Sequence, residues 1–146
     1  TEMAQGYLSR DPQRTVRVRL AGGRGYLTVK GVTHGASRAE YEYEIPPEDA
    51  RAMLALCDPP LVEKTRYVMD AAGRRWEVDV FHGANAGLVV AEVELPSETA
   101  EVTLPEWVEC EVTGEKRYYN SALIVHPYRC WTSAEKGKYP PSPVDK

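Results

Sequence analysis

The sequence predicts an α+β domain in which an antiparallel sheet closes into a β-barrel and helices pack outside it. The strongest observation is the strict alternation of glutamate with bulky residues over residues 40–45, which is the period of a half-buried strand. Five of the six predicted strands also carry like charges at positions i and i+2, opposite a mostly apolar face. Helical periodicity follows directly after the glutamate strand, so helices are expected beside the sheet.

The first elements are strands joined by tight turns. Residues 6–8 look like the end of a strand, and residues 15–20 and 26–31 alternate in the same way. The glycine-rich connection over residues 21–25 predicts that these two strands form a hairpin. A loop rich in glycine then leads into the glutamate strand, residues 38–45.

The glutamate strand places two sets of side chains on opposite faces. The charged set is Glu40, Glu42 and Glu44. The apolar set, which we expect to face the core, is Tyr41, Tyr43 and Ile45. The sheet is therefore expected to bury the tyrosines and to present a row of carboxylates on its other side.

A helix and three further strands follow in the middle of the chain. Proline and two acids open a helix at residue 47, and Asp58-Pro59-Pro60 ends it, so we expect this helix to pack outside the sheet without a chemical role. Strands are predicted over residues 62–68, 76–81 and 89–95. Residues 70–73 and 82–87 read as the connections between them.

The C-terminal part is less periodic. Residues 115–124 predict a short helix that caps one end of the sheet. Residues 131–146 hold three prolines and no periodic apolar set, so we interpret them as a mobile tail after a single domain, residues 1–130.

Length and composition restrict the function classes. With 146 residues, 42% of them hydrophobic, the chain can bury one core, and no apolar run or export signal predicts contact with a membrane. A net charge of −4 argues against a nucleic-acid binder. Three widely spaced cysteines, Cys57, Cys110 and Cys130, indicate free thiols in a reducing compartment, which favours the cytoplasm. His34 and His82, like His126, lie in or beside loops and are expected on the surface rather than at a metal.

The charged rows suggest a ligand. For any single strand a solvated sheet face is the simpler reading, but like charges that share a row repel, and a surface normally intersperses the signs. Rows segregated by sign are expected where strands face one another across a closed sheet. There, arginine and lysine rows would bind an anion and carboxylate rows would hold a hard cation beside it.

The strand motifs, in this order, resemble those of the CYTH family, the triphosphate tunnel metalloenzymes, over residues 5–128. The motifs that carry the resemblance are Gln5-Gly6-Tyr7-Leu8, Val16-Arg17-Val18-Arg19, Leu27-Thr28-Val29-Lys30-Gly31, Glu40-x-Glu42-Tyr43-Glu44-Ile45, Glu63-Lys64-Thr65-Arg66-Tyr67, Trp76-Glu77-Val78-Asp79-Val80-Phe81 and Ala91-Glu92-Val93-Glu94-Leu95. The resemblance, closest to the short bacterial members, implies an eight-stranded antiparallel tunnel. It also implies turnover of triphosphates with Mg²⁺ or Mn²⁺.

The expected site uses both kinds of charged row. The phosphate-binding cations are expected to be Arg17, Arg19, Lys30, Lys64 and Arg66. Within this set, Lys64 and Arg66 are also predicted to act as the catalytic residues. The predicted metal ligands are Glu40, Glu42, Asp79, Glu92 and Glu94.

We expect the protein to hydrolyse inorganic triphosphate. The expected ligand is a small triphosphate or polyphosphate, and the sequence does not decide between a monomer and a homodimer. Thiamine triphosphatase and class IV type adenylate cyclase are the alternatives within the enzyme class, and a non-catalytic polyphosphate- or nucleotide-binding module is the alternative outside it. The family signature also includes a first strand with Glu-x-Glu-x-Lys, which no residue before Gln5 supplies. We therefore expect a truncated form of an active enzyme, with divergence as the alternative, and poor turnover by the chain as written.

Overall fold

Seven strands form one antiparallel sheet in the computed structural model, which describes residues 1–97 and 99–136. The strand order is β4-β3-β2-β1-β5-β6-β7. The strands are β1 (Glu2–Ser9), β2 (Arg14–Ala21), β3 (Arg24–His34), β4 (Ser37–Ile45), β5 (Val62–Ala71), β6 (Arg74–Phe81) and β7 (Val89–Val93). The helices are α1 (Pro47–Leu56), η1 (Gly83–Asn85), η2 (Lys116–Tyr118), α2 (Asn120–Val125), η3 (Tyr128–Cys130) and α3 (Ser133–Lys136).

The predicted strands are confirmed, but some of their ends differ: β3 continues to His34 through the predicted loop, and β7 ends at Val93 rather than at residue 95. Gly22 and Gly23 join β2 to β3 with φ angles of 58° and 81°, a left-handed conformation that glycine adopts without strain. Sequence patterning predicted only the end of the first strand, at residues 6–8, whereas β1 begins at Glu2. It pairs with β2 on one side and with β5 on the other, so it joins the two halves of the sheet.

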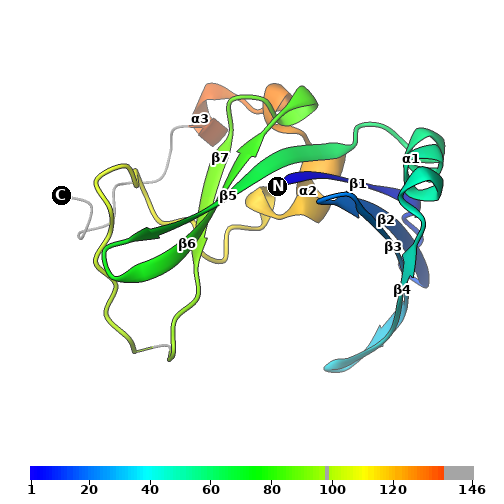
Figure 1. Cartoon of the computed structure of the whole chain (residues 1–146), viewed down its shortest axis with the longest axis horizontal. Helices are drawn as coiled ribbons and strands as arrows, with labels where there is room; N and C mark the ends of the chain where they lie inside the picture. The colour runs from blue at the N-terminus through cyan, green and yellow to red at the C-terminus, as the bar shows by residue number, and fades with distance from the viewer. Residues whose placement is uncertain (98, 137–146) are drawn as a thin grey trace.

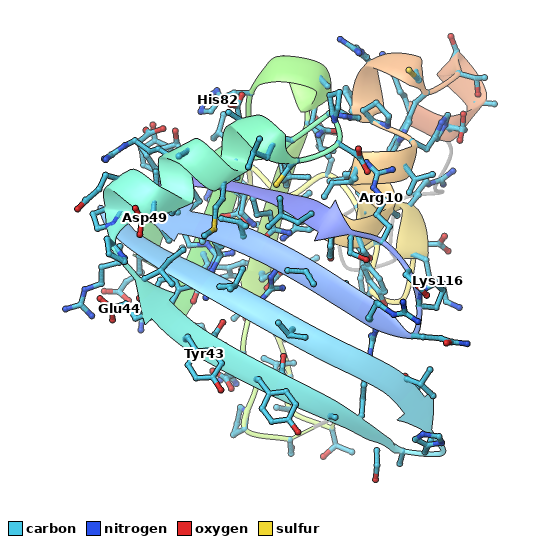
Figure 2. The ribbon with its side chains drawn as sticks, turned by 90° about the vertical axis from the view of Figure 1, so that its right-hand side faces the viewer. Arg10, Tyr43, Glu44, Asp49, His82 and Lys116 are labelled. Carbon is cyan, nitrogen blue, oxygen red and sulfur yellow. The ribbon has the colours of Figure 1, made fainter. Side chains whose placement is uncertain are left out.

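Helix α1 covers one face of β1, β2 and β3, as predicted (Figure 2). Its buried residues Ala50 and Leu54 pack with Val18 of β2 in one hydrophobic cluster. Helix α1 approaches β3 closely at Gly25. A Cβ atom added to this glycine would lie only 2.7 Å from the Cβ of Ala50, so no larger residue fits without a shift. Glycine at this position therefore lets the helix rest directly on the sheet.

A second hydrophobic cluster lies on the opposite face and is built around α2. Leu123 and Ile124 of this helix pack with Val62 of β5 and Phe81 of β6. In Figure 1, α2 lies between the half of the sheet that holds β2, β3 and β4 and the half that holds β6 and β7. A short helix within residues 115–124 is thus confirmed, but it lies over the charged face, between the two halves of the sheet, and not at one end of the sheet as predicted.

Two expectations about burial are wrong. Tyr41 and Tyr43 are 57% and 60% exposed, although their positions in the alternation predict the core side. The reason is that β4 is an edge strand, and the cluster under α1 reaches only as far as Ile45. Figure 2 shows Tyr43 on this outer face, away from the helix.

The predicted C-terminal tail, residues 131–146, includes a residue of the hydrophobic core. Trp131 is 5% exposed and packs its ring against Tyr118 and Tyr128, and α3 follows it. Aromatic residues in turns and single-turn helices show no period, which is why sequence patterning missed this packing. The remainder of the predicted tail, residues 137–146, lies outside the described residues.

The pairing of strands ends at β4 on one side and at β7 on the other. The antiparallel sheet with helices on its faces is confirmed, whereas its closure into a barrel stays a prediction. Within residues 1–97 and 99–136, no helix has the length and apolar character needed to cross a membrane.

Candidate active site

The charged rows share one face of the sheet, opposite to α1. Residues paired directly across antiparallel strands project to the same side. Gln5 of β1 is opposite Arg19 of β2 on one side and opposite Val62 of β5 on the other. This register places the arginines of β2 and the Lys64 row of β5 on one continuous face, with β1 between them.

The first cavity on this face has a volume of about 300 Å³. Its lining includes three cations and no carboxylate, so we call it the cationic cavity. The lining residues are Gln5, Tyr7, Thr15, Arg17, Thr28, Lys30, Arg38, Asn120 and Ser121.

Arg17, which lines the cationic cavity, begins a chain of two hydrogen bonds. Its Nη2 atom donates to Thr28 Oγ1 at 3.4 Å, and this hydroxyl donates to Glu42 Oε1 at 3.0 Å. The Nε atom of Arg17 is buried and has no hydrogen-bond partner among the described residues. A buried donor left without a partner is costly, so an anionic acceptor fits this position.

The other predicted cations of β2 and β3 are less enclosed. Lys30 Nζ lies 3.4 Å from Glu40 Oε1 on β4. Arg19 shares the charged face but is absent from the lining of this cavity and of the second. Its guanidinium stacks over the ring of Tyr26 and lies 3.6 Å from Glu42.

The second cavity lies over β5, β6 and β7 and has a volume of about 350 Å³. It combines two cations with two carboxylates, so we call it the mixed-charge cavity. The lining residues are Lys64, Arg66, Asp79, Phe81, Val90, Glu92, Tyr118, Tyr119 and Asn120.

Asp79 holds both cations of the mixed-charge cavity. Its Oδ2 accepts from Lys64 Nζ at 2.8 Å, and the guanidinium of Arg66 donates to both of its oxygens, at 2.7 and 2.9 Å. Burial opposes ionisation of this carboxyl, but the hydrogen bonds from Arg66 and Lys64 outweigh it and hold the pKa of Asp79 below its ordinary value. The hydrogen bond to Asp79 in turn raises the pKa of Arg66. Hydrogen bonds thus join the three side chains into one unit.

The five predicted metal ligands do not meet in one place. Asp79 and Glu92 line the mixed-charge cavity, Glu40 and Glu42 pair with cations on the other half of the sheet, and Glu94 follows the end of β7. Among the residues the structure describes, no group of three or more His, Cys, Asp or Glu side chains could hold a metal ion. Glu77 of β6 is directly opposite Glu92 of β7 on the charged face, and Glu77 is paired with Arg66 at 2.7 Å.

Several residues that line the cavities were not among the predicted site residues, and Arg38 and Asn120 are two of them. Arg38 has the same parity on β4 as Glu40 and Glu42, so the alternation that identified the glutamates could have found it. Asn120, at the start of α2, lines both cavities, and no periodic signal in the sequence marks it. His34, His82 and His126 are exposed, as expected, and no disulfide joins the cysteines of the described residues.

Several known proteins are similar to this chain in sequence and fold. A CYTH domain profile matches residues 2–122. An inorganic triphosphatase of Acetivibrio thermocellus is 52% identical over 126 residues, which are 86% of this chain and 81% of that protein. An inorganic triphosphatase of Nitrosomonas europaea is 37% identical over 128 residues, covering 84% and 83% of the two chains. A crystal structure of an inorganic triphosphatase matches with a TM-score of 0.74 at 34% identity and covers 85% of this chain and 84% of that one.

Proposed function

Because the chain belongs to the CYTH domain family, we propose that it is a triphosphatase that hydrolyses inorganic triphosphate. The observation that carries the proposal is the presence of two cation-lined cavities on one sheet face, joined at Asn120. The names of the two relatives, both inorganic triphosphatases, support the same substrate.

The cations on β2 and β3 bind the substrate in two ways, by direct contact with phosphate oxygens and by their positive potential. Arg17 and Lys30 bind phosphate oxygens in the cationic cavity, the arginine as a fork and the lysine as a point charge. Arg19 adds to the positive potential of the same face without lining either cavity. Each phosphate that binds competes with a glutamate now paired to these cations, which are only partly buried.

Lys64 and Arg66 are the catalytic residues of the proposal. Phosphoryl transfer depends mainly on positioning and on stabilising charge as it develops on the oxygens of the transferred group. Asp79 fixes both cations before the substrate arrives, so little reorganisation is needed when that charge develops. The unused N–H groups of the two side chains stabilise the reacting phosphoryl group.

Members of this family generally depend on divalent metal ions, and the mixed-charge cavity fits such an ion. Mg²⁺ is usually held by one or two carboxylates together with substrate phosphates, which agrees with a pair of carboxylates rather than a cage. Glu92, which lines this cavity, would hold it together with Glu77, which is opposite Glu92 on β6 and would have to exchange its 2.7 Å ion pair with Arg66 for the metal. Asp79 is bound by two cations, Lys64 and Arg66. When bound, Mg²⁺ or Mn²⁺ polarises the phosphoryl oxygen and lowers the pKa of water.

Closure of the sheet around the charged face is part of the proposal. Strands β4 and β7 are the edges of the sheet, and a free edge presents backbone groups that pair with a further strand. Enclosure would exclude water from the substrate and strengthen each charge interaction. The homodimer and the cytoplasmic location stay predictions.

Release of phosphate from triphosphate, with and without Mg²⁺ or Mn²⁺, tests the proposal. We expect metal-dependent release that is faster with inorganic triphosphate than with thiamine triphosphate, and no cyclic AMP from ATP. Tight binding without release would support the non-catalytic module instead. Preference for thiamine triphosphate or formation of cyclic AMP would replace the substrate and keep the family.

A further inference from the structure

One buried amide lies outside both cavities, and packing alone does not account for it. Asn85 belongs to η1, in the connection between β6 and β7, and is fully buried. Its Oδ1 atom accepts from the backbone N–H of Tyr128 at 2.8 Å. Its Nδ2 atom is buried and has no hydrogen-bond partner among the described residues. Because a buried donor without a partner lowers stability, an amide at this position requires a compensating role for its oxygen.

The hydrogen bond from Tyr128 attaches η3 to this connection, and Figure 1 shows the C-terminal turns beside it. The ring of Tyr128 also lies against Gly87, where an added Cβ atom would be 3.3 Å from Cε2 of the ring. Trp131 follows η3 directly, and the centroids of the Trp131 and Tyr128 rings are 5.0 Å apart. The contacts that Asn85 and Gly87 make with Tyr128 therefore decide where Trp131 enters the core.

Trp131 contacts the segments at both ends of α2. At the C-terminal end, its Nε1 donates at 3.0 Å to the backbone oxygen of His126, the residue that follows the last turn of α2. At the N-terminal end, its ring meets that of Tyr118 edge to face, with centroids 5.1 Å apart, two residues before α2 begins at Asn120. A helix of six residues is unstable alone, so these contacts help to fix its position.

The position of α2 affects both cavities. Asn120 lines both of them, and Tyr118 lines the mixed-charge cavity. Lys64 and Asp79, in contrast, are carried by β5 and β6 and are joined by their own hydrogen bond. A shift of α2 should therefore misplace Asn120 while the charged groups of the sheet stay in place.

We infer that Asn85 is a positioning residue for the proposed reaction. It acts through Tyr128 and Trp131, which hold α2 where Asn120 contacts the phosphates, and it touches no substrate itself. The inference rests on the proposed function and adds a requirement to it. The connection between β6 and β7 must keep the C-terminal turns in place for the site to be complete.

A double-mutant cycle on phosphate release from triphosphate tests this role. Asn85→Ala and Asn120→Ala should each lower kcat/KM about 10-fold, because a group that is displaced no longer orients the substrate. If Asn85 acts through Asn120, the double variant should lie within about 3-fold of either single variant, whereas independent effects would multiply to about 100-fold.

Two further variants separate positioning from stability. Leu54→Ala is the matched control, because Leu54 is buried in the hydrophobic cluster under α1, on the opposite face. It should lower the urea midpoint at least as much as Asn85→Ala does, yet leave kcat/KM within about 2-fold. Trp131→Phe keeps an aromatic ring and removes the donor to His126, and it replaces Asn85→Ala in the cycle if that variant does not fold.

Multiplicative effects of Asn85→Ala and Asn120→Ala would overturn the inference, as would an equal loss of kcat/KM in Leu54→Ala or an unchanged value in Asn85→Ala. A wild type that releases no phosphate would instead overturn the proposed enzyme. The same cycle would then be measured as calorimetric affinity for triphosphate, where coupling of the two substitutions supports the inference and additivity overturns it. A wild type that neither hydrolyses nor binds triphosphate would overturn both.

Discussion

The two cavities hold similar cations in different ways. In the mixed-charge cavity, Lys64 and Asp79 are each 6% exposed and lie 2.8 Å apart. In the cationic cavity, Lys30 is 3.4 Å from Glu40, and the two side chains are 31% and 55% exposed. A buried, hydrogen-bonded pair stays in place without ligand, whereas an exposed pair exchanges readily with phosphate. In the proposed function, the cations of the mixed-charge cavity are therefore preorganised for the reacting phosphoryl group, whereas those of the cationic cavity can adjust to the phosphates that they bind.

Lys64→Ala should have the largest effect on both activity and stability. It leaves Asp79 with one cation in a buried site, which should cost about 3 kcal/mol of unfolding free energy, and it should lower the rate of phosphate release roughly 100-fold or more. Lys30→Ala should cost under about 1 kcal/mol and mainly raise the KM for triphosphate. Urea unfolding and steady-state kinetics on the two variants would make this comparison. Equal stability of the two variants would contradict the contrast between buried and exposed pairs.

Asp79→Asn should change how stability depends on pH. Because the pKa of Asp79 is lowered in the folded state, its ion pairs contribute stability that is present above the ordinary carboxyl pKa of about 4. That stability is lost as the pH falls through the folded-state value. Urea midpoints measured from about pH 7 down to about pH 3 should therefore fall more steeply for the wild type than for Asp79→Asn. If the urea midpoints of both proteins fell equally with pH, a group other than Asp79 would cause the loss of stability in acid.

Glu92→Gln and Glu40→Gln should separate the two halves of the sheet by their need for metal. Glu92→Gln should raise the Mg²⁺ concentration for half-maximal activity about 10-fold, and Mn²⁺ binding measured directly should weaken in parallel. Glu40→Gln frees Lys30 and should leave metal binding within about 2-fold. A larger effect of Glu40→Gln would place the metal in the other half of the sheet.

The smallest effects should come from the face that α1 covers and from residues of the wrong parity. Val18→Ala removes methyl groups at a fully buried position, so we expect a loss of about 1 to 2 kcal/mol of stability with unchanged triphosphate affinity. Glu63→Gln, one residue before Lys64 but on the opposite face, should change neither property measurably. Loss of binding in Glu63→Gln would mean that charge anywhere on the sheet matters more than the cavities do.

The sequence predicted the strands and their faces because a period of two is a local property. Arg17, Lys64 and Glu63 project to the sides that alternation assigns to them. The partners of the charges could not be predicted, since they depend on which strands become neighbours. Asp79 was expected to bind metal, yet β6 lies beside β5 and sets it against Lys64 and Arg66.

Burial at the margins of the fold was equally hard to predict from local patterns. The tyrosines of β4 alternate correctly but lie at an edge, where no element covers them. Trp131 joins the core from the short link between η3 and α3, which shows no apolar period. In both cases the deciding factor is what packs alongside, and one strand or turn carries no information about that.

Helix α2 connects the two cavities, because its first residue, Asn120, lines both of them. A six-residue helix is unstable alone, so the packing of Leu123 and Ile124 against Val62 and Phe81 decides where Asn120 lies. Asn120 lines both cavities, and any shift of the helix alters both at once. Free-energy changes from substitutions at Asn120 should therefore fail to add to those from substitutions in either cavity. The hydrophobic anchor of α2, although it touches no phosphate in the proposal, sets the coupling free energy between the two ends of the substrate.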